Sequence, residues 1–310
     1  MIWTFVLQPR VPGVHIFGTD YGKDNSNNGY VTPSDDFARP LNRGYGVQQL
    51  TAPAPRARPA ASTTPEPSWT TNNPSSYLID GGLWTACKES RAVIEQEYEA
   101  KRWRAFTNAE LSSFDYRGDY PQEKIRRPST GYFLNNGSPH YFTVFPNRDL
   151  FYFQANGLEW EMISRHGIPS RHPLWGPTHG FREPYHVAIE YNPEWRTNNQ
   201  SGDIYDFAEV TVASYINIIW FVDYRLKRRT PGSTNRKRAI FEGADRRFVE
   251  VVGCHIGAEH MHDEFEDSGS LEFYEAVEKA ATWQENNENN SDLIGSYGRA
   301  HFGILACELL

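Results

Sequence analysis

The chain has 310 residues, of which 39% are hydrophobic and 14% aromatic, so it can bury the core of one large domain. Its formal net charge of −8 argues against a general nucleic-acid-binding protein. No apolar run approaches the roughly 20 residues that span a bilayer, which argues against a membrane protein. The cysteines are too few and too widely spaced for a disulfide framework, which favours an intracellular, reducing compartment; they are Cys87, Cys254 and Cys307.

The N-terminal part of the chain begins with a predicted strand over residues 10–17. Residues 20–76 then lack hydrophobic periodicity, and residues 51–76 hold six prolines among Ala, Ser, Thr and Asn. Such a composition buries too little apolar surface to offset the entropy lost on ordering. We therefore expect one domain made of residues 1–19 and 77–310, interrupted by a disordered insertion at 20–76.

Regular patterns resume after the insertion. A helix is predicted over residues 81–104, because Leu83, Cys87, Ile94 and Tyr98 share one helical face. Residues 141–145 and 150–153 read as strands, and the Pro-Asn-Arg-Asp sequence between them is typical of a hairpin turn.

The C-terminal half adds strands at 185–191, 215–224 and 239–252, and a helix at 270–283 with one apolar face. The apolar stretch 302–310 is too short to assign. Together these elements predict an α+β fold with a mainly antiparallel sheet, one face of which is covered by the helices at 83–104 and 270–283.

One segment resembles a known family. Residues 83–91 read Leu-Trp-Thr-Ala-Cys-Lys-Glu-Ser-Arg, and they are similar to the second signature of the fungal two-EXR family, in which a Cys precedes a Glu-x-Arg triplet on a helix. Here Glu89 and Arg91 are the charged residues of that triplet. Residues 10–17 and 144–151 are similar to strands of the same family. The family's first triplet lies in a helix before an Ile-Trp pair, and because Ile2 and Trp3 directly follow Met1, we expect that helix to be missing here.

The resemblance implies little about activity, because the family is defined by sequence. It implies a protein-interaction domain, and the missing helix, which resembles the start of an F-box, motivates the alternative of a ubiquitin-ligase adaptor. For Glu89 and Arg91 we favour a structural ion-pairing role, with Arg91 near Glu95 one turn on, over a partner-binding role, because charged residues beside an apolar stripe usually fix packing.

Searches for catalytic motifs find no nucleophile elbow, phosphate-binding loop or dinucleotide-binding turn. The one metal-like group is His255, His260 and His262, whose spacing matches neither a metalloprotease helix nor a zinc finger, so we favour a solvated loop. We therefore expect no catalytic residue, cofactor or metal. A hydrolase or metal-dependent enzyme whose site assembles from distant residues is the remaining enzymatic alternative.

Charge is segregated along the chain. Residues 225–247 hold nine basic and two acidic residues, whereas residues 259–288 hold ten acidic residues and one lysine. The stretch from Lys227 to Arg238 resembles a nuclear-localisation signal, but we favour a basic loop that lies near the acidic segment. The leading interpretation is a non-enzymatic intracellular protein that binds another protein.

Overall fold

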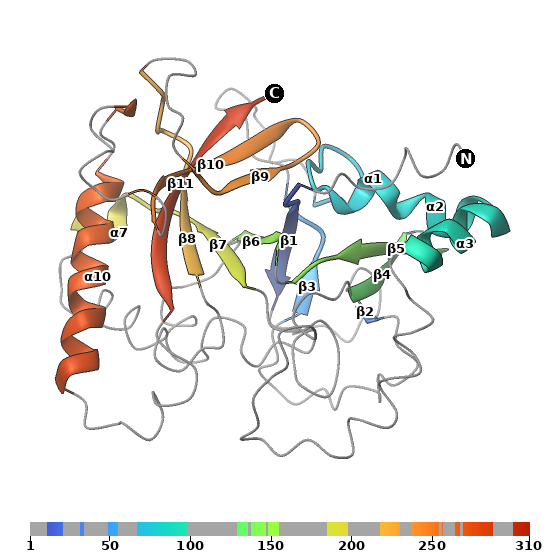
Figure 1. Ribbon diagram of the computed structural model, residues 1–310, viewed down its shortest axis with the longest axis horizontal. Helices are drawn as coiled ribbons and strands as arrows, with labels where there is room; N and C mark the ends of the chain where they lie inside the picture. The colour runs from blue at the N-terminus through green and yellow to red at the C-terminus, as the bar shows by residue number, and fades with distance from the viewer. Residues whose placement is uncertain are drawn as a thin grey trace.

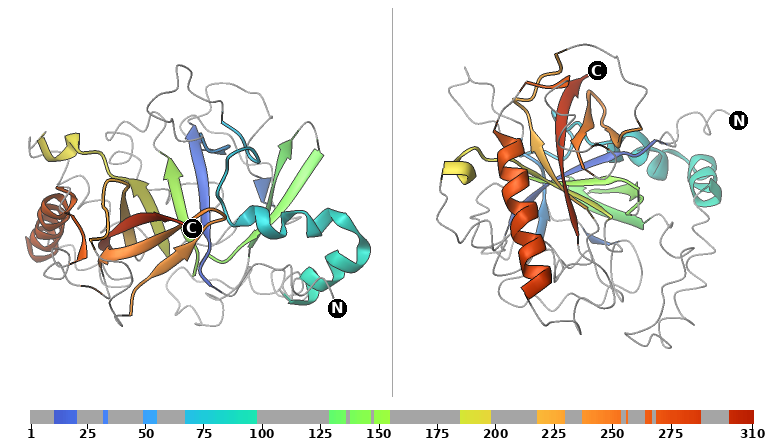
Figure 2. Two further views of the ribbon diagram at one scale, coloured as in Figure 1. Left: turned by 90° about the horizontal axis from the view of Figure 1, so that it is seen from above. Right: turned by 60° about the vertical axis from the view of Figure 1, so that its left-hand side comes forward.

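The structure, a computed structural model, describes residues 11–20, 32–33, 49–54, 67–97, 129–135, 138–146, 148–154, 185–197, 218–229, 237–253, 256, 264–266, 269–287 and 300–310. The strands in these ranges are β1 (Val14–Asp20), β2 (Thr32–Pro33), β3 (Gln49–Thr51), β4 (Ser129–Asn135), β5 (Ser138–Val144), β6 (Leu150–Gln154), β7 (His186–Glu190), β8 (Ile218–Asp223), β9 (Ile240–Glu242), β10 (Arg246–Val252) and β11 (His301–Leu309). The helices are α1 (Tyr77–Gly81), α2 (Leu83–Ala86), α3 (Lys88–Glu97), α7 (Glu194–Thr197) and α10 (Ser270–Asn287). Figures 1 and 2 show a strongly curved sheet with α10 along one side and α1 to α3 on the opposite side.

The larger of the two described sheets is mixed and mostly parallel. Its strand order is β3-β1-β6-β7-β8-β11-β10-β9, and the five strands from β1 to β11 in this order run parallel. The strands β3, β10 and β9 join antiparallel at the two ends. The smaller sheet, β2-β4-β5, is antiparallel.

The larger sheet curls until β9, at one end of the strand order, reaches the residues that lead into β1, the neighbour of β3 at the other end. The backbone N–H of Glu242 in β9 donates to the carbonyl oxygen of Pro12 at 2.8 Å, and Gly13 forms a parallel bridge with Glu242. A sheet that returns on itself in this way is a nearly closed barrel.

Side chains fill the inside of this barrel. Successive residues of a strand point to opposite faces, and the inward-facing set forms one buried cluster that includes Val14, Leu150, Ile218, Trp220, Phe241, Phe248 and Leu305. Trp220 lies directly against β11, because a Cβ added to Gly303 would come within 2.4 Å of the Trp220 ring. The described interior is therefore a packed core.

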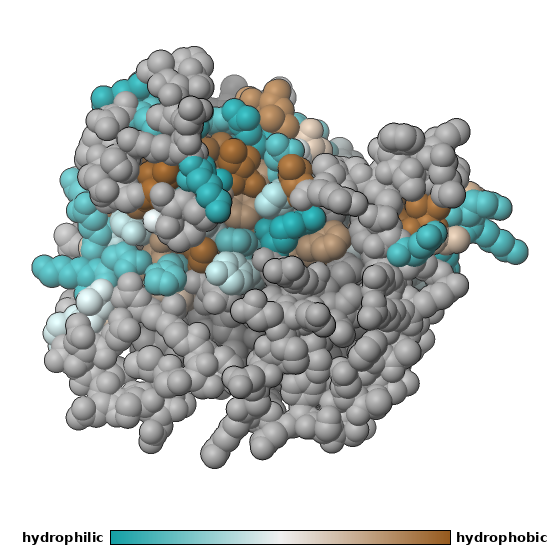
Figure 3. Space-filling view, viewed as in Figure 1, coloured by the Kyte–Doolittle hydropathy of each residue, from teal (hydrophilic) through white to brown (hydrophobic). Residues whose placement is uncertain are grey.

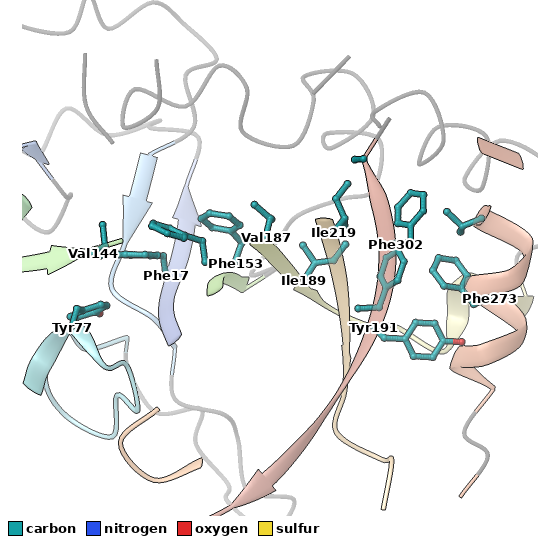
Figure 4. Close-up of a cluster of buried hydrophobic side chains, with 14 of the residues drawn as sticks. Phe17, Tyr77, Val144, Phe153, Val187, Ile189, Tyr191, Ile219, Phe273 and Phe302 are labelled. Atoms are coloured by element: carbon teal, nitrogen blue, oxygen red, sulfur yellow. The ribbon is translucent and has the colours of Figure 1, made fainter. Parts of the chain in front are cut away.

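The outer face of the same strands carries a second core. Phe17, Phe153, Val187, Ile219 and Phe302 belong to it, and it continues onto α1 and the smaller sheet at one end and onto α10 at the other. Figure 4 shows this row of side chains running from Tyr77 of α1 to Phe273 of α10.

The expected α+β fold with a mainly antiparallel sheet is therefore wrong, whereas the strands at 185–191, 215–224 and 239–252 and the helix at 270–283 are confirmed as β7, β8, β9 with β10, and α10. The antiparallel prediction fails because it assumed a sheet with one covered face, whereas both faces of this sheet are buried. Every residue of β8 is buried, which is the pattern of a parallel strand covered on both sides. The stretch between β6 and β7, residues 155–185, also has the length that a crossover between parallel strands requires.

The predicted hairpin around residues 146–149 is also wrong, because β5 and β6 belong to different sheets. The turn instead buries Asp149, which is fully inaccessible. Its carboxylate accepts hydrogen bonds from His15 Nε2 at 2.8 Å, from the backbone N–H of Gly13 at 3.0 Å and Phe145 at 2.9 Å, and from Arg148 Nε at 2.9 Å. We call this group the Asp149 hub. It joins the end of β5 and the start of β6 to the start of β1.

The single helix expected over 81–104 is instead two short helices, α2 and α3, which follow α1, and Cys87 between α2 and α3 has an extended backbone. Residues 98–104 lie outside the described residues. Parts of the expected insertion at 20–76 take part in the fold. The strand β3 pairs with β1, and Trp69 is buried in the outer core. Within 20–76 the structure describes residues 20, 32–33, 49–54 and 67–76, and the others lie outside the described residues.

Candidate functional site

The Glu-x-Arg segment lies where α2 ends and α3 begins. Its buried residue is the middle one, Ser90, whose Oγ donates to the carbonyl oxygen of Leu83 at 2.7 Å and accepts from the N–H of Cys87 at 3.1 Å. In return Cys87 Sγ accepts from the N–H of Ser90 at 3.3 Å. This reciprocal pair is a capping box with sulfur in place of a hydroxyl, and it starts α3.

The two charged residues of the segment, Glu89 and Arg91, are exposed. The pKa of Glu89 is lowered by a hydrogen bond from its own backbone N–H and by one with Cys87. The side chain of Glu95, the expected neighbour of Arg91, lies outside the described residues. The structure therefore assigns packing to Ser90, and both the ion-pairing and the partner-binding role of Glu89 and Arg91 stay predictions.

The histidine group cannot be placed, because His255, His260 and His262 lie outside the described residues. Among the residues that are described, no three His, Cys, Asp or Glu side chains come together as potential metal ligands.

The basic stretch from Lys227 to Arg238 divides into structural and exposed residues. Arg228 lies 3.2 Å from Glu308, and Arg238 pairs with Glu264 of the acidic segment. Lys227, Arg229 and Lys237 are exposed, and residues 230–236 lie outside the described residues. The contact of Arg238 with Glu264 agrees with the expected proximity of the basic and acidic segments.

The helix α10 is firmly anchored by one face. Gly269, whose φ of 80° suits glycine, precedes it, and its carbonyl oxygen accepts from the Tyr191 hydroxyl at 3.2 Å. Phe273 then packs on Phe221 of β8 at 5.0 Å between ring centroids. Further along the helix, Glu278 Oε1 accepts from the N–H of Phe302 at 3.1 Å.

The opposite face of α10 is solvent-exposed and polar except for one aromatic residue. At about 100° per residue, four exposed residues fall within roughly 80° of one another. We call them the α10 outer stripe: Glu272, Glu275, Lys279 and Trp283. Trp283 is 56% exposed, although tryptophan is usually mostly buried. In Figure 3 the described residues over α10 are teal to white, so this part of the surface is hydrophilic.

The outer stripe was not singled out from the sequence, although a signal was present. Position 283 falls about 120° from the centre of the apolar face of Phe273, Val277 and Ala281, and the helix itself was predicted. Projecting Trp283 on that helix would have placed it in solvent.

A second group of polar side chains lies inside the barrel at the carboxyl ends of the parallel strands, where parallel sheets and barrels usually bind ligands. The Tyr152 hydroxyl donates to Glu190 Oε2 at 3.2 Å, and Tyr224 is hydrogen bonded to Tyr152. Arg246, nearby, makes two hydrogen bonds to Asp245, at 2.7 and 2.9 Å.

The chemistry of this group is limited by Tyr224. Burial, with Cys307 and Glu190 acting in the same direction, raises the pKa of Tyr224 to about 12, although Tyr152 and Arg246 oppose the shift. The phenol therefore stays protonated at neutral pH and donates a hydrogen bond instead of acting as a base. Nothing in the sequence pointed to this group, because it depends on the parallel alignment of strands that are distant in the chain.

Comparisons with protein-family models, curated proteins and solved structures find no match to this chain. The resemblance of residues 83–91 to the two-EXR family stays a prediction. Of the helices that the structure describes, none combines the length and apolar character needed to cross a bilayer.

Proposed function

We propose that this chain is a non-enzymatic protein-interaction domain and that its partner binds the α10 outer stripe. The observation that carries the proposal is Trp283, a large aromatic side chain that is 56% exposed within an otherwise polar helix face. Tryptophan is enriched among the residues that dominate the energy of protein interfaces, because its rigid indole buries a large area at a small cost in conformational entropy.

The way α10 is held also supports this role. Its inner face is packed on β8 and β11 through Phe273, Val277 and Ala281, so the helix presents Trp283 from a fixed position. A surface that is ordered before binding loses less entropy when the partner docks. In addition, the described inside of the barrel is packed with side chains, which favours an outer surface as the binding site.

The test compares two exposed aromatic residues. Immobilised wild-type chain, Trp283→Ala and Tyr185→Ala are incubated with extract of the native cells, and the bound proteins are quantified. Tyr185 is 38% exposed and directly precedes β7, away from the sequence of α10, so it serves as the matched control. We expect a protein that is retained by the wild type and by Tyr185→Ala and is lost from Trp283→Ala. Equal retention by all three chains would contradict the proposal.

We further propose that the protein acts inside the cell, as its few, widely spaced cysteines favour. The basic stretch is tested by replacing the residues that are exposed in its described part, Lys227, Arg229 and Lys237, with Gln, because Arg228 and Arg238 form ion pairs. A fluorescent fusion of this triple variant should keep the wild-type distribution. A shift from nucleus to cytoplasm would instead favour the localisation signal.

A further inference from the structure

The charge of the α10 outer stripe identifies the chemistry of its partner. Resting on the function proposed above, we infer that the segment bound by the stripe is a basic protein segment, rich in lysine and arginine. The inference starts from Glu272 and Glu275, which are both exposed and lie on the same helix face as Trp283.

The stripe itself carries a net negative charge. It holds two exposed carboxylates, Glu272 and Glu275, against a single positive residue, Lys279. Glu266, shortly before the helix, is also exposed, but its backbone N–H donates to the carbonyl oxygen of Lys227, which is exposed and basic, so only the charge of the stripe is counted. The whole run from 259 to 288 has the same sign, with ten acidic residues and one lysine.

The sign of the charge also decides between classes of partner. Nucleic acids and anionic membrane surfaces carry negative charge and are repelled by exposed carboxylates. A basic segment is attracted to the carboxylates of Glu272 and Glu275, and a guanidinium or ammonium group of the same segment can lie over the Trp283 indole as a cation–π contact. The stripe thus offers a basic protein segment both attractive charge and an aromatic anchor.

The experiment measures binding of a fluorescently labelled, lysine- and arginine-rich peptide with interspersed leucines to the full chain, with a glutamate-rich counterpart as the opposite-charge probe. We expect the basic peptide to bind and the acidic peptide to fail. The double variant Glu272→Gln/Glu275→Gln should bind the basic peptide roughly threefold to thirtyfold more weakly. Raising the salt concentration to about 0.15 M from low ionic strength should weaken binding to the wild type more than to the double variant.

The matched control is Glu89→Gln, which removes an exposed carboxylate from α3, on the other side of the barrel. It should leave binding of the basic peptide unchanged. Equal binding by the wild type and the double variant would overturn the inference. So would a salt-sensitive self-association of the chain that the double variant abolishes, because the stripe would then bind a second copy.

The two proposals fail in different ways. Suppose that Trp283→Ala fails to retain the protein that the wild type captures, while the double variant Glu272→Gln/Glu275→Gln retains it at every salt concentration. The interaction surface would then stand, and the basic character of the partner would be wrong. If Trp283→Ala retains the same proteins as the wild type, the proposed function itself fails.

Discussion

The two sides of the barrel share the apolar outer core but differ in the buried polar contacts that are added to it. On the side of the smaller sheet, the Asp149 hub joins β1, β5 and β6 through a fully buried carboxylate with four donors. On the opposite side, α10 is held on β8 and β11 mainly by apolar contacts of residues such as Phe273 and Val277. We call these the polar side and the apolar side.

The difference matters because the two kinds of contact respond differently to change. A buried charge that loses a partner stays buried without compensation, so a polar hub tolerates little alteration. Apolar packing loses energy in proportion to the area or volume that is removed. The apolar side can therefore hold α10 rigidly while its outer face varies freely, which suits a surface for partner binding.

The largest expected effect is on the polar side. Replacing Asp149 with Asn removes the charge that His15 and Arg148 face in a fully buried site, so we expect the free energy of unfolding to fall by about 3–5 kcal/mol. Urea denaturation measures this. The control is Asp245→Asn, whose carboxylate is 57% exposed and should cost less than about 1 kcal/mol. If the two variants lose equal stability, the hub is not what holds the polar side.

Acid should remove part of the stability that the ionised Asp149 provides. Burial alone raises the pKa of Asp149, but the hydrogen bond and charge of His15, with Arg148 and the N–H of Gly13, lower it by more, so the net pKa lies below its usual value. The ionised hub therefore adds stability at pH values above the unfolded pKa of about 3.9, and this stability is lost as pH falls through the folded-state pKa. Unfolding measured from neutral pH down to about pH 2 should reveal this loss in the wild type. A curve for Asp149→Asn with the same slope in that window would argue against it.

A smaller effect is expected inside the barrel, where β11 packs against Trp220. A Cβ at Gly303 would lie 2.4 Å from the Trp220 ring, so Gly303→Ala should lower the free energy of unfolding by about 1–3 kcal/mol through overpacking. Gly82→Ala is the control, because nothing lies within 4 Å of the Cβ that it would add. Thermal unfolding compares the two, and an unchanged Tm for Gly303→Ala would mean that Trp220 does not fill the barrel at this point.

Local patterns in the sequence revealed individual elements of this fold better than their pairing. The helix α10 and the strand β8 were predicted because their patterns are local. The parallel order was missed because it depends on which distant strands become neighbours, as when β11 enters between β8 and β10. The Pro-Asn-Arg-Asp sequence predicts a turn correctly, but turn residues do not show whether the two flanking strands pair with each other, so the hairpin prediction is wrong. In that turn Asp149 has a tertiary role that no short pattern encodes.

The two candidate sites differ in the same way, since one depends on a local pattern and the other on the pairing of distant strands. Trp283 could be placed on the outer face from helical spacing alone, since the apolar face of α10 was recognised. By contrast, the hydrogen-bonded chain of Tyr224, Tyr152 and Glu190 joins β6, β7 and the residue that follows β8, and none of these segments carries a signature of it.

A still smaller effect is expected at the start of α3 on the polar side. Ser90→Ala removes the hydroxyl that bonds to Leu83 and Cys87, so we expect a loss of about 1 kcal/mol in the free energy of unfolding. Ser138→Ala, at an exposed position of β5, should change stability little. Circular dichroism during urea unfolding measures both variants. If Ser90→Ala leaves the free energy of unfolding unchanged, the capping box does not stabilise the fold.

The smallest effect on stability is expected at Trp283, and this sharpens the contrast between the two faces of the apolar side. Trp283→Ala leaves the inner face of α10 intact and introduces a residue with high helix propensity, so the free energy of unfolding should change by less than about 0.5 kcal/mol. Trp220→Ala, which empties a fully buried position, should cost about 3–5 kcal/mol. Tm values of the two variants test this difference. A large loss for Trp283→Ala would give the indole a structural role, whereas a neutral result means that any binding lost with Trp283 is lost at the surface and not through unfolding.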